Sequence, residues 1–121
     1  VASGDVEGMT RELRRVAEIH QGVKDWVRLG RFLQEAGDVD GARVALTTAA
    51  AMDGGKTVGP HLTLARFYDH IGDDNAALER YRMALWIDGE NETAREGIRA
   101  HGQVPGPSYA LQPAELDTAS E

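Results

Sequence analysis

Apolar residues recur at spacings of three and four along most of the first 101 positions, which is the spacing that places them on one face of an α-helix. The first stretch, residues 5–20, carries Met9, Leu13, Val16, Ala17 and His20 on one face. Further helices are predicted at 23–36, 39–52, 60–71 and 75–88, and Asn91 is placed to cap a short helix that ends near His101. No stretch alternates as a strand would, so the pattern predicts an all-α chain.

The dipeptide Gly-Asp punctuates this pattern three times, at Gly4-Asp5, Gly37-Asp38 and Gly72-Asp73, with spacings of 33 and 35 residues. Glycine suits the left-handed position that ends a helix, and aspartate suits the N-cap of the next. A regular period of this size is typical of a helical repeat array, in which each repeat packs against its neighbours.

The residues between the Gly-Asp turns follow a shared pattern. One copy reads Trp26-x2-Leu29-Gly30-x2-Leu33, then Ala42-x3-Leu46 and Ala49. The next reads His61-x2-Leu64-Ala65-x2-Tyr68, then Ala77-x3-Tyr81 and Ala84. This pattern resembles the tetratricopeptide repeat (TPR) family, whose unit is a helix-turn-helix of about 34 residues. The sequence departs from the family at Gly54 and Gly89, where a closing proline is usual, and at Met9, where a small residue is usual.

The resemblance implies a TPR-like helix-turn-helix solenoid, an α–α superhelix of about five to six helices with an irregular C-terminal tail. A plain antiparallel helical bundle is the alternative. The predicted parts are a half repeat at 1–22, repeats at 23–57 and 58–91, a closing helix at 92–101 and a tail at 102–121. Because the tail contains Pro105, Gly106, Pro107 and Pro113, we expect no regular helix in it.

The half repeat is an orphan second helix whose partner would lie upstream of Gly4. We expect that further repeats precede it, that it caps the array, or that another chain covers it. The chain begins at Val1 without methionine, so we expect a fragment of a longer protein. For the tail, we expect packing on its own domain or on a neighbouring molecule, with Tyr109 and Leu111 as anchors.

In the TPR family, the first helix of each repeat lines a concave groove. Carried over, the groove positions are Lys24, Val27, Arg31 and Gln34 in one repeat and Gly59, Leu62, Arg66 and Asp69 in the next. Arg28 lies one turn from Lys24 and from Arg31, and the resemblance implies that Arg31 and Arg66 stand side by side. Such a basic strip would suit an acidic segment or a C-terminal carboxylate. Alternatively, these arginines are solvated or paired with Glu35, Asp69 and Asp73.

Composition narrows the classes of partner. The 121 residues fit one domain, and the net charge of −7 disfavours binding to nucleic acid or to an anionic membrane surface. The absence of cysteine excludes disulfides and thiolate zinc sites but leaves the compartment open, cytoplasmic or periplasmic. No apolar run approaches the roughly 18–20 residues that span a bilayer.

The candidate chemical sites are weak. His61 and His70 are nine residues apart on nearly opposite helix faces, and His61 replaces a core aromatic, so we expect no metal site. Asp69, Asp73 and Asp74 are expected to cap helices, and Trp26 and Trp86 to lie in the core. Gly54-Gly55-Lys56-Thr57 lacks the spacing and the preceding strand of a phosphate-binding loop.

No arrangement of nucleophile, base or paired carboxylates supports catalysis, so we expect neither an enzyme nor a cofactor site. The sequence therefore predicts a non-catalytic protein-protein interaction module that binds a peptide or a partner surface, an acidic one by preference. Two alternatives stay open. One is self-assembly through the uncovered N-terminal helix or the tail, and the other is a recruiting or regulatory domain of a longer protein, membrane-anchored or not.

Overall fold

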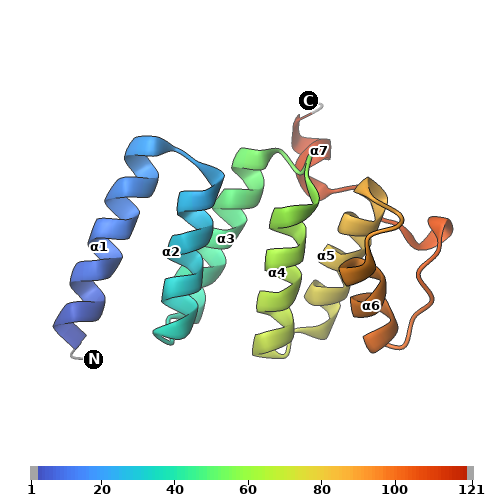
Figure 1. The fold of residues 1–121 in the computed structure, drawn as a ribbon, viewed down its shortest axis with the longest axis horizontal. Helices are drawn as coiled ribbons and strands as arrows, with labels where there is room; N and C mark the ends of the chain where they lie inside the picture. Colours follow the sequence, from blue (N-terminus) through green and yellow to red (C-terminus); the bar gives the residue numbers. More distant parts are fainter. Residues whose placement is uncertain (1–2, 120–121) are drawn as a thin grey trace. The chain divides into compact units, whose positions relative to one another are not determined.

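The computed structural model describes residues 3–119, and the side chains of residues 5–116. Within this range the chain is helical and has no strand (Figure 1). The elements are α1 Ser3–His20, α2 Val23–Glu35, α3 Val39–Asp53, α4 Val58–Ile71, α5 Asp74–Ile87, α6 Glu92–Ala100, the 3-10 turn η1 Pro107–Tyr109, and α7 Ala114–Ala119. Within each compact part of the chain, helices pack on their neighbours in sequence, which confirms the prediction of an all-α, repeat-like fold.

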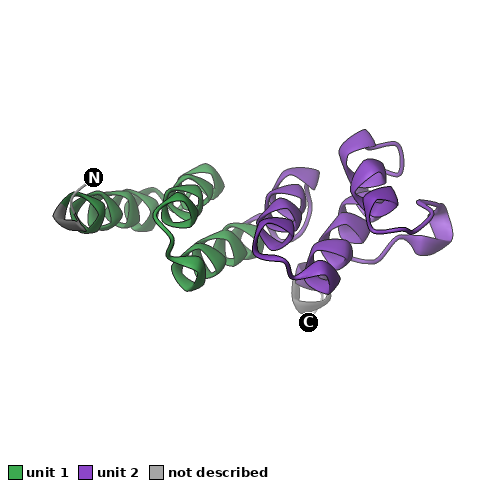
Figure 2. Ribbon diagram, turned by 90° about the horizontal axis from the view of Figure 1, so that it is seen from below, with its two compact units in different colours: residues 1–52 green, residues 53–121 purple. Residues whose placement is uncertain are grey.

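The chain forms two compact units (Figure 2). Unit 1 ends at Met52 and contains α1, α2 and nearly all of α3, whereas unit 2 begins at Asp53 and contains α4 to α7. Among the helices of residues 3–119, none is long and apolar enough to cross a membrane.

Two of the three Gly-Asp dipeptides form the predicted turns. Gly37 and Gly72 have φ angles of 89° and 82°, the left-handed region that glycine adopts without strain. Asp38 then accepts a hydrogen bond from the Gly41 amide at 2.9 Å, and Asp73 accepts one from the Ala76 amide at 3.2 Å. The first dipeptide differs, because α1 already begins at Ser3 and Gly4 lies inside it.

The core of unit 1 is built largely from small residues that let helices approach closely. Gly30 of α2 faces Leu46 of α3 so tightly that a Cβ atom built on Gly30 would lie 2.5 Å from Leu46 Cδ2. Ala42, which opens the second half of the repeat pattern, is fully buried. The other buried apolar residues of this unit are Ala17, Leu29, Leu33, Ala45, Ala49 and Ala50.

Helix α1 packs on α2 but buries less than its apolar pattern predicts. Of the residues expected on its inner face, only Ala17 is buried; Leu13 and Val16 are half-buried, and Met9 is 49% exposed. In the described part of unit 1, the tight packing against α2 is limited to the turn around Ala17.

Unit 2 has the larger side chains in its core. A cluster of Ala65, Ala77, Tyr81, Leu85 and Ile98 joins α4, α5 and α6. Gly97 of α6 makes room for the ring of Tyr81, since a Cβ atom on Gly97 would lie 2.5 Å from Tyr81 Cζ. Asn91 caps α6 by accepting a hydrogen bond from the Ala94 amide at 2.9 Å, as predicted.

Two expectations about unit 2 are wrong. The tail is not wholly irregular, because α7 follows Pro113 directly, where proline has no helical hydrogen bond to lose and its fixed φ suits a helix start. Trp86 is 49% exposed rather than buried, because it lies outside the buried face of α5. The buried positions of α5 include Ala77, Tyr81, Ala84 and Leu85. Trp26, also expected in the core, is half-buried in α2.

Candidate functional site

The groove positions predicted in the first repeat all lie on α2. Lys24, Arg28 and Arg31 are exposed, while Val27 and Gln34 are half-buried. The Nη1 atom of Arg28 lies 4.0 Å from Oδ1 of Asp25, one turn earlier, which is the longest distance at which two charged groups count as an ion pair. Arg31 forms no ion pair with any side chain that the structure describes, so this helix presents three cationic side chains to solvent.

The groove positions predicted in the second repeat lie on α4 and have different surroundings. Arg66 is exposed and forms no ion pair within the described residues. Leu62 is half-buried and packs against the core cluster of unit 2. Gly59 lies in the first turn of α4 with open space around it. Since Arg31 belongs to unit 1 and Arg66 to unit 2, their predicted alignment stays a prediction.

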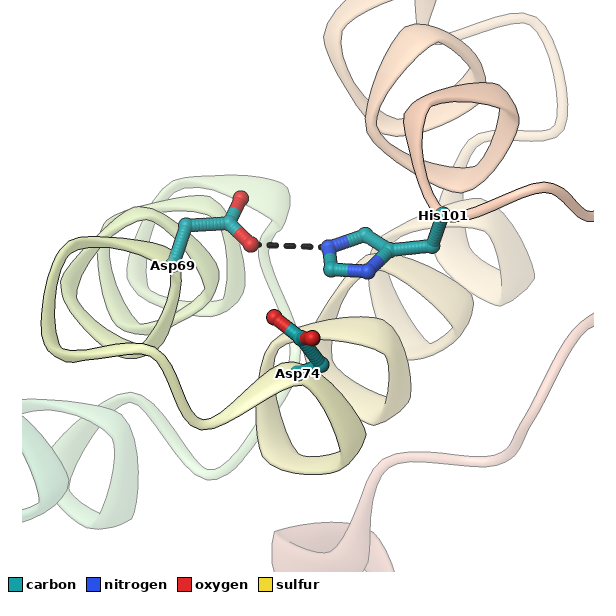
Figure 3. Close-up of side chains that lie close together, drawn as sticks. All are labelled: Asp69, Asp74 and His101. Carbon is teal, nitrogen blue, oxygen red and sulfur yellow. Dashed lines mark hydrogen bonds and ion pairs between the residues drawn. The ribbon is translucent and has the colours of Figure 1, made fainter.

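Asp69, the last predicted groove position, is exposed but is bonded by other helices of unit 2 (Figure 3). His101, at the C-cap of α6, places its Nε2 atom 2.7 Å from Asp69 Oδ1, and the Tyr81 hydroxyl donates to Asp69 Oδ2 at 2.7 Å. Burial raises the pKa of Tyr81 to about 12, and the neighbouring Asp69 carboxylate acts in the same direction. One carboxylate therefore ties α4 to α5 and to the end of α6.

Asp74, the first residue of α5, completes a group with Asp69 and His101 in which one ligand atom from each lies within 4.8 Å of the others (Figure 3). The sequence did not predict this group, because His101 is 32 positions from Asp69 and only helix packing joins them. Both oxygens of Asp69 already accept hydrogen bonds, and Asp74 is exposed. The arrangement acts as a link between helices.

The tail packs on its own unit, along α5. The Leu111 amide donates to the Arg82 carbonyl at 3.1 Å, and Arg82 Nε donates back to the Tyr109 carbonyl at 2.9 Å. The Arg82 guanidinium also lies over the Tyr109 ring, 4.4 Å from its centroid. Of the two outcomes expected for the tail, packing on its own domain is the one observed.

An ion pair between α7 and α5 holds the end of the tail on unit 2. Arg80 donates to both carboxylate oxygens of Glu115, at 3.0 and 2.8 Å, and both side chains are only 13% exposed. Burial alone would raise the pKa of Glu115, but the hydrogen bonds and charge of Arg80 outweigh burial and hold that pKa below its ordinary value. This pair joins residues 35 positions apart.

His61 lies beneath this ion pair and is fully buried, as the sequence predicts. Its Nδ1 atom accepts from Arg80 at 3.1 Å, and its Nε2 atom lies 3.3 Å from the Gly55 carbonyl. Burial lowers the pKa of His61, with the Arg80 charge acting the same way. The neutral ring therefore acts as a packed hydrogen-bonding residue between α4 and α5.

The side chain of Trp86 borders a cavity of about 350 Å³ in unit 2. Its lining includes Trp86, Leu85, Glu90, Arg95 and Pro107. Arg95 donates to the Gly89 carbonyl at 3.1 Å, which holds the arginine at the cavity wall. This cavity could not be predicted from the sequence, because the tail supplies one side of it.

No protein-family model and no curated protein matches this chain. Its function is therefore inferred from the exposed residues and packed contacts of the two units.

Proposed function

We propose that this chain is a non-catalytic interaction module of the TPR type, which binds a peptide or a partner surface through the exposed faces of α2 and α4. The support is the repeated turn chemistry at Gly37-Asp38 and Gly72-Asp73, together with the close α2–α3 contact at Gly30. In such arrays each helix pair presents one face to a ligand while its other faces pack on neighbours.

The observation that carries the proposal is the charge on these faces. The chain has a net charge of −7, yet α2 exposes Lys24, Arg28 and Arg31, and α4 exposes Arg66. Arg31 and Arg66 form no ion pair within the described residues, so their guanidinium groups are available to form paired hydrogen bonds with carboxylates. The ligand class is accordingly an acidic segment or a free C-terminal carboxylate.

Reversing two of these charges tests the proposal. We expect Arg31→Glu combined with Arg66→Glu to weaken binding of an acidic peptide with a free C-terminus by at least about tenfold, because attraction becomes repulsion. Fluorescence anisotropy with a labelled peptide measures the dissociation constant, and an amidated peptide separates the terminal carboxylate from the acidic side chains.

The matched control is Arg14→Glu combined with Arg99→Glu, which makes the same change in net charge at exposed positions on α1 and α6. The control is expected to retain binding, and both variants should melt close to the unmodified chain. Equal loss in the two variants would show general electrostatics and refute the groove assignment. Self-assembly and a regulatory role in a longer protein stay predictions.

A further inference from the structure

Two clefts lie where the N-terminal half of α1 meets the C-terminal half of α2. The larger, of about 430 Å³, is lined by Asp5, Val6, Met9, Phe32, Glu35 and Ala36. We refer to it as the α1–α2 cleft. A second cleft, of about 330 Å³, shares Val6 and Ala36 with it and is otherwise lined by Glu7, Thr10, Arg11, Leu33 and Asp38. All of these residues belong to unit 1.

The floor of the α1–α2 cleft is apolar and incompletely covered. Val6 and Met9, three residues apart on α1, face Phe32 and Ala36, four residues apart on α2. Val6 and Phe32 are half-buried, whereas Met9 is 49% exposed and Ala36 is exposed. Methionine is flexible and polarizable, so it adapts to the shape of an apolar group placed against it.

The rim of the same cleft is acidic. Asp5 contributes a carboxylate from α1 and Glu35 contributes one from α2, and no basic side chain lines this cleft within the described residues. Glu7 and Asp38 add two carboxylates in the neighbouring cleft, where Arg11 is the one basic side chain among the lining residues. Arg31, which carries the function proposed above, lies one turn before Glu35 and lines neither cleft.

We propose that the α1–α2 cleft is a second interaction surface and that it binds a basic amphipathic segment. Such a segment would insert one large apolar side chain, of leucine or phenylalanine size, between Met9 and Phe32. Lysine or arginine residues on either side of that anchor would reach Asp5 and Glu35. A cleft of a few hundred Å³ with an apolar floor and a few polar groups suits one such anchor.

Charge complementarity selects this occupant over the others. A second copy that used the same face would set Asp5 and Glu35 against their own equivalents, which is a repulsive arrangement. An acidic segment, the ligand class proposed for α2 and α4, would be repelled in the same way. The two surfaces therefore differ in position and in the sign of the charge that they select, so neither proposal depends on the other.

The first experiment measures binding of three labelled helical peptides to the full chain. The probe carries leucines at spacings of three and four with lysines between them; in one variant glutamate replaces lysine, and in the other serine replaces leucine. The lysine–leucine peptide is expected to bind and the lysine–serine peptide is not, and a rise from low to physiological salt should weaken the lysine–leucine peptide by screening the rim charges. Binding of the glutamate–leucine peptide belongs to the basic faces of α2 and α4 and should be lost in the Arg31→Glu, Arg66→Glu variant. Binding of the lysine–serine peptide with equal affinity would overturn the proposal, because it would show that the apolar floor is not used.

The second experiment places the peptide by mutation. Glu35→Lys, alone or with Asp5→Lys, is expected to weaken the lysine–leucine peptide by at least about tenfold, because a repulsive rim replaces an attractive one. Met9→Ser should weaken it severalfold by removing floor area. Glu79→Lys with Glu96→Lys, two exposed positions in unit 2, makes the same charge change as the double rim variant and should leave the affinity within about twofold.

The Glu35→Lys variant keeps the proposal testable if Asp5→Lys disturbs folding. Glu35 is the last residue of α2, where a cation favours the helix, whereas Asp5 lies in the first turn of α1, where an anion does. Equal affinities for Glu35→Lys and the unit 2 control would overturn the assignment. The assignment would also be overturned if light scattering showed that the chain dimerises and that Glu35→Lys abolishes the dimer. A second copy of the chain would then be the occupant of the cleft.

Discussion

Two glycines inside helices of unit 1, Gly8 and Gly30, have opposite surroundings. Gly8 lies in α1, and a Cβ atom built on it would meet nothing within 4 Å. Gly30 lies in α2, and the same atom would meet Leu46 Cγ at 2.6 Å and Cδ2 at 2.5 Å. Both glycines weaken the isolated helix, but only Gly30 is required by packing.

The same substitution should therefore have opposite effects at the two positions. We expect Gly8→Ala to stabilise the chain by up to about 1 kcal/mol, because alanine is the better helix former. Gly30→Ala should lower the free energy of unfolding by about 1–2 kcal/mol, since overpacking against the buried Leu46 outweighs the gain in propensity. Denaturant unfolding of both variants measures the difference, and a stabilised Gly30→Ala would contradict the close contact.

At the scale of elements, the tail is held to unit 2 by contacts of different kinds. Gly55 has a φ angle of 69°, and a Cβ atom on it would lie 3.0 Å from the Cβ atoms of Pro113 and Glu115. A larger residue would therefore be strained at this position beneath the tail. Pro113 is buried, and Glu115 pairs with Arg80. The tail therefore contributes to the structure of unit 2 itself.

Glu115→Gln tests how the tail is held. The substitution leaves Arg80 partly buried without its counter-ion, so we expect a loss of about 1–3 kcal/mol in the free energy of unfolding. Hydrogen exchange at the Leu111 amide, which donates to Arg82, should become faster as the tail detaches.

Glu96→Gln, at an exposed position on α6, is the control and should change neither measurement. Unchanged exchange at Leu111 in Glu115→Gln would show that the Arg80–Glu115 pair does not hold the tail.

At the scale of the whole molecule, the two units differ in the size of the apolar side chains that they bury and in how many such side chains they leave exposed. Unit 2 buries Phe67, Leu64 and Tyr81, links three of its helices through Asp69 and covers α5 with the tail. Unit 1 has an alanine-rich core and an N-terminal helix with Met9 and Ile19 exposed, the latter by 64%. Larger buried side chains remove more apolar area from water, so unit 2 holds more of the stability.

Residues 53–121 should accordingly fold when expressed alone, with a helical circular dichroism spectrum and a cooperative melting transition. Residues 1–52 alone should be only marginally helical, because a piece of about 50 residues with a small core buries too little apolar surface. A disordered 53–121 fragment would show that its core depends on unit 1.

The pattern of apolar positions and turn residues was sufficient to predict α2 to α6 and their caps at Asp38, Asp73 and Asn91. These features are local: a helix repeats every few residues, and a capping side chain bonds a backbone amide three positions away. A small residue also recurs at one place in the repeat, as Gly30 and then as Ala65, and this too is visible in the sequence alone.

The remaining features depended on which helices pack together. Asp69 was predicted as a groove position and as a helix cap, and only the placement of α5 and α6 shows that Tyr81 and His101 engage it. By itself the sequence determined the helices and the charge of their exposed faces, because both follow from residues close along the chain. The tertiary structure decided the tail contacts, the Asp69 link and the acidic α1–α2 cleft, because those depend on residues that only folding brings together.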